Sequence, residues 1–144
     1  MAAPKSVPSS GSTIIPGLRY RNAPAAIDWL CNAFGFEKSL VIPGDNDTIA
    51  HAQLTFGTGM IMLGTVREGE TRFTLQQPSQ IGGAETQFPY VVVADCDGHY
   101  ARAKTAGAKI VVEIHDEEYG GRGYACRDLE DHLWYFGSFN PWHG

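Results

Sequence analysis

The sequence predicts an α+β fold in which two β-α-β-β-β modules form a curved, eight-stranded mixed sheet with the helices on its convex face. The chain has 144 residues, which is the size of one domain with one hydrophobic core. Its elements occur twice in the same order, about 73 residues apart, and a self-similar period marks repeated units. In each copy a glycine, Gly35 or Gly107, ends the helix.

We expect four segments along the chain. Residues 1–12 are rich in Ser, Pro, Ala and Gly and predict a flexible tail, because such a composition cannot offset the entropy lost on ordering. The first module spans 13–64 and the second spans 88–140. Between them, 65–87 is polar and turn-rich, which predicts a crossover linker without a packed element. Together these segments make one domain.

The first module begins with period-two alternation from Thr13 to Tyr20, which is typical of a half-buried strand. Asn22 can cap a helix whose first turn holds Pro24, and apolar residues then recur at helical spacing up to Gly35. Three strand candidates follow, bounded by turn residues. They are Glu37–Ile42, Ile49–Phe56 and Gly59–Gly64.

The second module repeats this order. The apolar run Phe88–Val93 predicts a strand, Asp95 can cap the following helix, and Gly107 ends it. Three further strands complete the module. They are Ile110–Glu113, Gly123–Asp128 and Leu133–Phe139.

The composition excludes several classes of function. The chain has 11 basic and 16 acidic residues and lacks a Lys/Arg cluster that could follow a phosphate backbone, so nucleic acid is not an expected partner. No apolar run approaches the roughly 20 residues that span a bilayer, and the first residues lack the apolar stretch of a secretory signal. We therefore expect a cytoplasmic protein without a membrane partner. The odd, widely spaced cysteines Cys31, Cys96 and Cys126 are interpreted as packing residues.

The runs 13–36 (TIIPGLRYRNAPAAIDWLCNAFGF) and 119–136 (YGGRGYACRDLEDHLWYF) resemble the vicinal oxygen chelate superfamily, which includes glyoxalase I, bleomycin resistance proteins and extradiol dioxygenases. The second run resembles the PhnB-like, glyoxalase-like branch, in which Tyr-Gly-x-Arg-x-Tyr/Phe precedes Asp-Pro-Glu-Gly-His-x-Trp. Here Leu129 replaces the Pro and Asp131 replaces the Gly. Because Asp tolerates a positive φ better than most residues, we expect the turn to survive.

The resemblance implies that a ligand binds on the concave face of the sheet, and strand alternation then sorts the side chains. On the strand 88–93, alternation turns Pro89, Val91 and Val93 inward. The assignment of Tyr124 holds only if its strand has no bulge, since a bulge shifts the alternation by one residue. The side chains predicted to bind the ligand are Arg19, His51, Gln53, Met60, Met62, Tyr124 and Tyr135.

Metal-dependent members of the superfamily place His, Gln or Glu at four inward positions, one on each of the first, fourth, fifth and eighth strands. The resemblance carries these positions onto Ile15, Met62, Pro89 and Tyr135. The first three cannot ligate a hard or borderline divalent ion, and neutral tyrosine is a poor ligand. A slip of one residue brings in other side chains that are equally unsuited, namely Ile14, Ile61, Phe88 and Trp134. We therefore predict neither a metal nor a cofactor.

These observations favour a metal-free protein of the bleomycin-resistance type that sequesters an aromatic or amphipathic small molecule. Met and Tyr side chains would supply apolar surface, and His51, Gln53 and Arg19 would orient the ligand. Because no nucleophile can be placed beside a base, no catalytic residue is assigned. The alternatives are a glyoxalase-like metal-dependent lyase, isomerase or dioxygenase, a metal-free enzyme with His51 as general base, and an assembly protein with a filled pocket. The resemblance also implies a homodimer.

The remaining polar residues have simpler interpretations. His51 and Gln53, two positions apart on one strand, either contact a ligand or hydrogen-bond each other. Arg19 either recognises an anionic group or pairs with a carboxylate such as Glu113. His132 is expected to support its hairpin turn. Surface positions are expected for His99, Arg122, His143 and residues 115–118.

Overall fold

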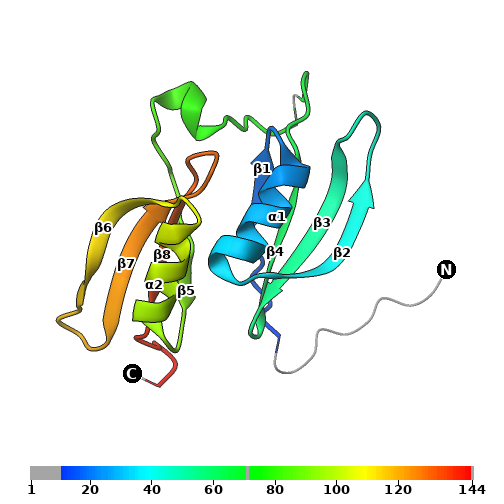
Figure 1. Ribbon diagram of the computed structural model, residues 1–144. Coiled ribbons are helices and arrows are strands. Elements are labelled where there is room, and N and C mark those ends of the chain that lie inside the picture. Colours follow the sequence, from blue (N-terminus) through cyan, green and yellow to red (C-terminus); the bar gives the residue numbers. More distant parts are fainter. Residues whose placement is uncertain (1–10, 71, 144) are drawn as a thin grey trace.

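The computed structural model describes residues 11–70 and 72–143 (Figure 1). The predicted flexible tail, 1–12, therefore lies outside the described residues except for its last two positions. Of these, Ser12 donates its backbone N–H to the carbonyl oxygen of Thr58 at 2.9 Å. Within the described ranges, no helix is both long and apolar enough to cross a bilayer.

The predicted α+β class and the order β-α-β-β-β, present twice, are confirmed. The first module contains β1 (Gly17–Tyr20), α1 (Ala23–Phe34), β2 (Glu37–Pro43), β3 (Ile49–Phe56) and β4 (Gly59–Thr65). The second contains β5 (Tyr90–Val92), α2 (Cys96–Thr105), β6 (Lys109–Asp116), β7 (Arg122–Arg127) and β8 (Leu133–Gly137). The prediction that the crossover holds no packed element is wrong at one place, because it contains the 3₁₀ helix η1 (Pro78–Ile81) with Pro78 buried.

The eight strands are divided between two four-stranded mixed sheets, ordered β1-β4-β3-β2 and β5-β8-β7-β6. In each sheet the first strand of the module runs parallel to the last, and the other pairs are antiparallel. The helices α1 and α2 lie on the same side of the two sheets and contact each other (Figure 1). The opposite, concave side of both sheets is therefore left without helices.

The strand register confirms the internal repeat. Gly17 pairs with Met62 in the first module, and Tyr90 pairs with Tyr135 in the second, so both partners are displaced by 73 residues. The chain thus places equivalent backbone positions in equivalent pairs although the side chains differ. This displacement assigns a counterpart in the second module to each position of the first.

Both helices begin at their predicted caps. The side chains of Asn22 and Asp95 each accept the backbone N–H of the third residue that follows, at 3.2 and 3.0 Å, which satisfies one of the unpaired donors of a helix start. At its other end, α1 stops at Gly35, whose φ of 85° lies in the left-handed region that favours glycine. Both predicted starts therefore hold, as does the predicted stop of α1, whereas α2 ends at Thr105 with Ala106 as its C-cap, before the predicted stop at Gly107.

One hydrophobic core serves both modules. Phe34, the last residue of α1, packs against Trp134 and Phe136 of β8, with ring centroids 5.4 and 4.7 Å apart. Aromatic pairs at such distances gain stability beyond the area that they bury. The predicted packing role of two cysteines is also confirmed, since Cys96 and Cys126 are buried in this core. The modules are therefore not separate folding cores.

The end of α1 is held by polar groups of α2. His99 lies 2.6 Å through Nδ1 from the Tyr124 hydroxyl and 2.8 Å through Nε2 from the Phe34 carbonyl oxygen. Burial lowers the pKa of His99. Arg102 donates to the carbonyl oxygen of Asn32 at 2.7 Å, a favourable position for a cation at a helix C-terminus. The prediction that His99 lies at the surface is wrong, because the side of α2 that carries His99 packs against α1.

Candidate functional site

The concave face of the first module carries most of the predicted ligand-binding residues. His51 and Gln53 on β3, together with Met60 and Met62 on β4, are half-buried. Gln53 pairs directly with Met62, so their side chains share one face, while the intervening side chains are buried in the core. The sequence therefore places these four side chains on one surface, and the structure brings them together.

Two polar groups of this face have distinct environments. His51 Nε2 lies 3.0 Å from Gln53 Oε1, so the two residues hydrogen-bond each other, which is one of the two predicted interpretations. Arg19 is half-buried on β1 and places its guanidinium over Gly64, where a Cβ would meet Arg19 Nη1 at 2.9 Å. Within the described ranges it forms no salt bridge, so the predicted pairing with Glu113 is wrong.

The alternation predicted for β7 is wrong, and Tyr124 does not face the concave side. Tyr124 is fully buried and pairs across the strands with Phe136, which belongs to the core beneath the helices. The residues of β7 on the concave side are the small Gly123 and Ala125, because Ala125 pairs with Tyr135 of that side. The large aromatic ring occupies the core face, where it buries more area.

The alternation predicted for β5 is shifted as well. Val91 pairs with the buried Phe136, and Val93 is only 4% exposed, so both valines face the helices. Tyr90 instead pairs with Tyr135 and shares its face. The residues of this segment on the concave side are therefore Phe88 and Tyr90. The predicted inward set of Pro89, Val91 and Val93 is wrong.

The concave face of the second module is built from aromatic rings. Tyr90 and Tyr135 stack with centroids 5.8 Å apart and planes inclined by 30°, and Phe88 lies 6.5 Å from Tyr135. Of these three rings, only Tyr135 was predicted from the sequence to bind the ligand. The 73-residue repeat was the signal that could have found the others, because it relates Gly17 to Tyr90.

A carboxylate lies at one end of these rings. Glu117, which follows β6, accepts a hydrogen bond from the Tyr135 hydroxyl, and its Oε1 lies 3.1 Å from His115 Nε2. Its side chain is only 11% exposed, so the prediction that it is a solvated surface acid is wrong. Burial and the hydrogen bond to Glu117 raise the pKa of Tyr135. The Glu113 carbonyl, and then Glu117, raise the pKa of His115.

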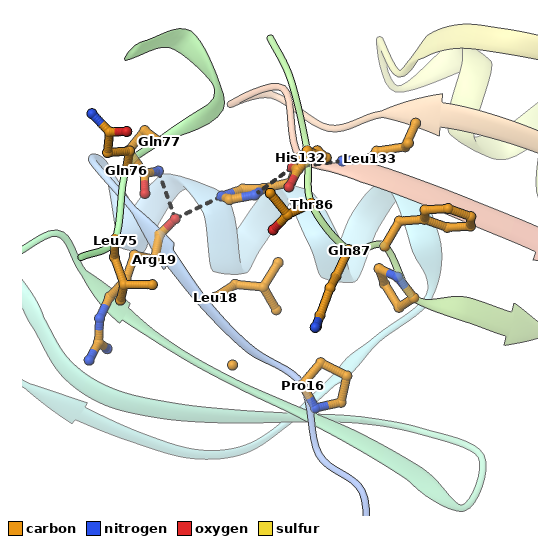
Figure 2. Close-up of a pocket in the computed structure, with 14 residues that line it drawn as sticks. Pro16, Leu18, Arg19, Leu75, Gln76, Gln77, Thr86, Gln87, His132 and Leu133 are labelled. Atoms are coloured by element: carbon orange, nitrogen blue, oxygen red, sulfur yellow. Dashed lines mark hydrogen bonds and ion pairs between the residues drawn. The ribbon is translucent and has the colours of Figure 1, made fainter. Parts of the chain in front are cut away.

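Two pockets lie in the seam between the modules, and Pro16 and Pro89 line both of them. The larger has a volume of about 540 Å³ and includes Met60 and Tyr90, so it touches the concave faces of both modules. Trp142, which is 92% exposed, also lines it. The smaller, of about 330 Å³, lies between β1, the crossover and the start of β8, as Figure 2 shows.

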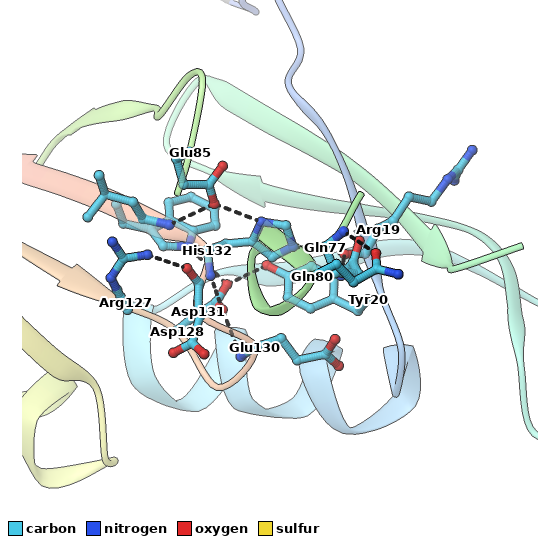
Figure 3. A network of polar contacts seen from close by, with 12 residues as sticks. Arg19, Tyr20, Gln77, Gln80, Glu85, Arg127, Asp128, Glu130, Asp131 and His132 are labelled. Atoms are coloured by element: carbon cyan, nitrogen blue, oxygen red, sulfur yellow. Dashed lines mark hydrogen bonds and ion pairs between the residues drawn. The ribbon is translucent and has the colours of Figure 1, made fainter. Parts of the chain in front are cut away.

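The polar groups of the smaller pocket hold the chain together. His132 approaches Glu85 Oε1 through Nδ1 at 3.2 Å and the Arg19 carbonyl oxygen through Nε2 at 2.8 Å (Figures 2 and 3). Gln77 donates to the same carbonyl at 2.8 Å. Both ring nitrogens of His132 are thus engaged by protein groups. The His132 ring therefore holds the crossover and β1, and not the backbone of its own turn as predicted, and no ring nitrogen is left free for catalysis.

Beside this pocket, the turn between β7 and β8 enters the first module (Figure 3). Asp128 is 1% exposed and accepts hydrogen bonds from the Tyr20 hydroxyl at 2.6 Å and from Trp134 Nε1 at 3.0 Å. Burial raises its pKa. Glu130 accepts the backbone N–H groups of Arg21 and Asn22, at 2.6 and 2.9 Å. We call these two carboxylates, Asp128 and Glu130, the joint carboxylates.

The positions at which the superfamily places metal ligands do not fit a metal here. Pro16 and Pro89 accept equivalent backbone hydrogen bonds, from Met62 and Tyr135, so the counterpart of Ile15 in the second module is Phe88 rather than Pro89. Ile, Met, Phe and a tyrosine with a raised pKa offer no ligand set for a divalent ion. Nor does any cluster of three or more His, Cys, Asp or Glu suited to a metal occur within 11–70 and 72–143.

The fold and this face place the chain in a known class. The family model of the Glyoxalase/Bleomycin resistance protein/Dioxygenase superfamily matches residues 14–136. The chain therefore belongs to this superfamily, as the sequence motifs indicate.

Several individual proteins are similar to this chain. The crystal structure of TioX from Micromonospora sp. ML1 is 38% identical, with a TM-score of 0.69 over 88% of this chain and 98% of TioX. An uncharacterized protein of Mycobacterium bovis is 28% identical over 122 residues, which are 85% of this chain and 80% of that protein. The fosfomycin resistance protein FosX from Listeria monocytogenes, solved with Mn(II) and sulfate, has 13% identity and a TM-score of 0.64 over 90% of this chain and 91% of FosX. The likeness to FosX is one of fold alone.

Proposed function

We propose that this protein binds a flat aromatic or amphipathic small molecule on its concave face, without a metal and without transforming it. The observation that carries the proposal is the set of side chains on that face. Met60 and Met62 provide adaptable apolar surface in the first module, and Tyr90 and Tyr135 provide stacked rings in the second. Mostly apolar surface with a few oriented polar groups is typical of small-molecule sites.

The polar groups of this face support binding more than catalysis. His51 is hydrogen-bonded to Gln53, and no Ser, Cys or Thr nucleophile is hydrogen-bonded to a histidine in the described ranges. A nucleophile requires such a base within hydrogen-bond reach. The metal-dependent alternative lacks ligands at the four family positions. We therefore rank sequestration above a lyase, isomerase or dioxygenase activity.

A homodimer remains a proposal, and the edges of the sheets support it. All seven residues of β2 are exposed, and they include Leu40 and Ile42 at 42% and 45%. On β6, Val111 is 52% exposed. Exposed apolar edge strands are prone to pair with another chain. A sedimentation experiment is expected to give a dimer, and a monomer at micromolar concentration contradicts this part of the proposal.

Binding is tested by titrating planar aromatic compounds and following tryptophan fluorescence, because Trp142 lines the larger pocket. We expect saturable quenching by at least one compound, which mass spectrometry recovers unchanged. Tyr135→Ala should weaken binding about tenfold, as expected for the loss of one stacked ring. Thr105→Ala, at an exposed position at the end of α2, lines neither pocket and is the control with unchanged affinity. Consumption of the compound, or binding that requires a stoichiometric divalent ion, contradicts the proposal.

A further inference from the structure

Two glycines shape the aromatic face of the second module. Gly123 on β7 and Gly137 on β8 are direct cross-strand partners. A Cβ on Gly137 would lie 3.0 Å from the Tyr90 ring, and a Cβ on Gly123 would lie 3.0 Å from the Tyr135 ring. A real Cβ at this distance would displace the ring by a few tenths of an ångström, so glycine at both positions lets each ring lie close against the sheet backbone. The two tyrosines therefore form an aromatic platform.

Hydrogen bonds at both ends hold this platform in place. The Tyr90 hydroxyl donates to the Phe139 carbonyl oxygen at 2.7 Å, and the Tyr135 hydroxyl donates to Glu117. Because both hydroxyl groups are hydrogen-bonded to the protein, the aromatic faces of the two rings are the part available to contact a ligand. Tyr90 also lines the 540 Å³ pocket, so the platform is continuous with this cavity.

Glu117 gives the platform a negative end. A Cβ on Gly123 would lie 2.5 Å from Glu117 Oε1, so the carboxylate rests against the same bare backbone as the Tyr135 ring. Tyr135 and His115 both approach Oε1. Burial, together with the charge of Glu117 and a hydrogen bond to it, raises the pKa of Tyr119. Because a carboxylate offers about four acceptor sites, Glu117 can still accept from one further donor. A carboxylate that is only 11% exposed interacts more strongly with a charge than one in open water.

We propose that the platform and Glu117 select ligands that carry a positive charge on a flat aromatic frame. This inference rests on the proposed function and names the ligand class of the same site. The faces of Tyr90 and Tyr135 stack on a planar ring and attract its cationic charge. Glu117 accepts from an ammonium or amidinium group at the edge of that ring.

The test compares two probes with the same ring system, 9-aminoacridine, whose amidinium-like cation carries N–H donors and persists at about pH 8, and acridine, which is neutral at that pH. Affinities are measured by isothermal titration calorimetry. We expect wild type to bind the cation about tenfold more tightly than acridine, a preference of about 1.4 kcal/mol. Glu117→Gln should abolish this preference while acridine affinity is retained. Glu118→Gln, at the exposed neighbouring acid, is the matched control and should retain the preference.

The outcomes separate the two proposals. Equal affinity for both probes in wild type, or a preference that survives Glu117→Gln, overturns the inference and leaves the proposed function standing. Binding of neither probe contradicts both. If Glu117→Gln does not fold, as judged by circular dichroism, Gly137→Ala provides the second variant. It should displace the Tyr90 ring and weaken both probes together about threefold or more, and unchanged affinity for both overturns the role of the platform.

Discussion

The two hairpin turns at equivalent places in the modules have different roles. In the first module, Gly57 and Thr58 form a short turn whose interaction is with Ser12. In the second, the turn between β7 and β8 carries Asp128 and Glu130, which are 1% and 6% exposed and accept hydrogen bonds from the first module. At these turns, the contacts that join the modules come from the second module. The second turn fixes the first module, whereas the first turn has no such role.

The concave faces differ in the same way. The first module offers flexible methionines and a hydrogen-bonded His51–Gln53 pair, while the second offers stacked Tyr90 and Tyr135 with Glu117. One backbone plan thus carries an adaptable surface and a rigid one.

Removal of Asp128 should have the largest effect. Asp128→Ala leaves the Tyr20 hydroxyl and the Trp134 Nε1–H buried without an acceptor, and we expect a loss of about 3 kcal/mol in the free energy of unfolding. The measurement is urea denaturation followed by fluorescence. Thr58→Ala, in the equivalent region of the other turn, should change the stability by less than about 0.5 kcal/mol. Equal losses in both variants contradict the one-sided joint.

Glu130 should contribute less. Its carboxylate accepts two backbone N–H groups at the start of α1, where a negative charge also interacts favourably with the helix dipole. We expect Glu130→Ala to cost about 1 to 2 kcal/mol and Glu130→Gln to cost less, because the amide oxygen still accepts. The amide exchange rates of Arg21 and Asn22 should rise in Glu130→Ala. If these amides stay protected, Glu130 does not cap α1.

Asp131 tests the backbone of the same turn. Its φ is 70°, and Gly57 in the other turn has a φ of 56°, so both turns need a residue in the left-handed region. This confirms the expectation that Asp131 takes over the role of a glycine. Asp131→Ala should cost about 1 kcal/mol in thermal or urea unfolding, and Asp131→Gly should cost less. A stability of the Ala variant equal to that of the Gly variant would show that the turn is not strained there.

His99 predicts a pH dependence of the contact between the helices. Its pKa is lowered by burial, so the folded state favours the neutral ring, and its contribution is complete above the unfolded pKa of about 6.5 and is lost as the pH falls below it. Wild type should therefore lose more stability than His99→Gln between about pH 7.5 and about pH 5.5. The shift of His115 has the opposite sign, but it is common to both proteins and cancels in the comparison. Parallel curves contradict the prediction.

Much of the fold could be predicted because local signals agreed with it. The caps Asn22 and Asp95 and the glycine stop of α1 mark the helices in the sequence alone. Alternation placed His51 and Gln53 on the concave face, since β3 has apolar residues at every second position. Met60 and Met62 lie on the all-apolar β4 and could be placed because the short turn after Phe56 makes β4 the hairpin partner of β3. The superfamily also followed from the motif that ends at Phe136.

The rest depends on contacts that no local pattern records. In β7 every residue from Gly123 to Cys126 is small or apolar. The sequence pattern therefore does not show which of these side chains face the core, and Tyr124 was placed on the wrong face. Glu117 reads as part of an acidic run, and only the fold brings the Tyr135 hydroxyl to it. The joint carboxylates likewise meet the end of β1 and the start of α1 across more than a hundred residues of sequence.

The cap on the first helix has a consequence for synthesis. Glu130 accepts N–H groups of residues that precede it by 108 and 109 positions. At roughly 5 to 20 residues per second, a ribosome adds Glu130 about 5 to 22 s after Asn22. Throughout that interval the start of α1 lacks its acidic partner, and Phe34 lacks Trp134 and Phe136. The amino-terminal half therefore remains incompletely folded in the nascent chain until the second half has been made as far as Phe136.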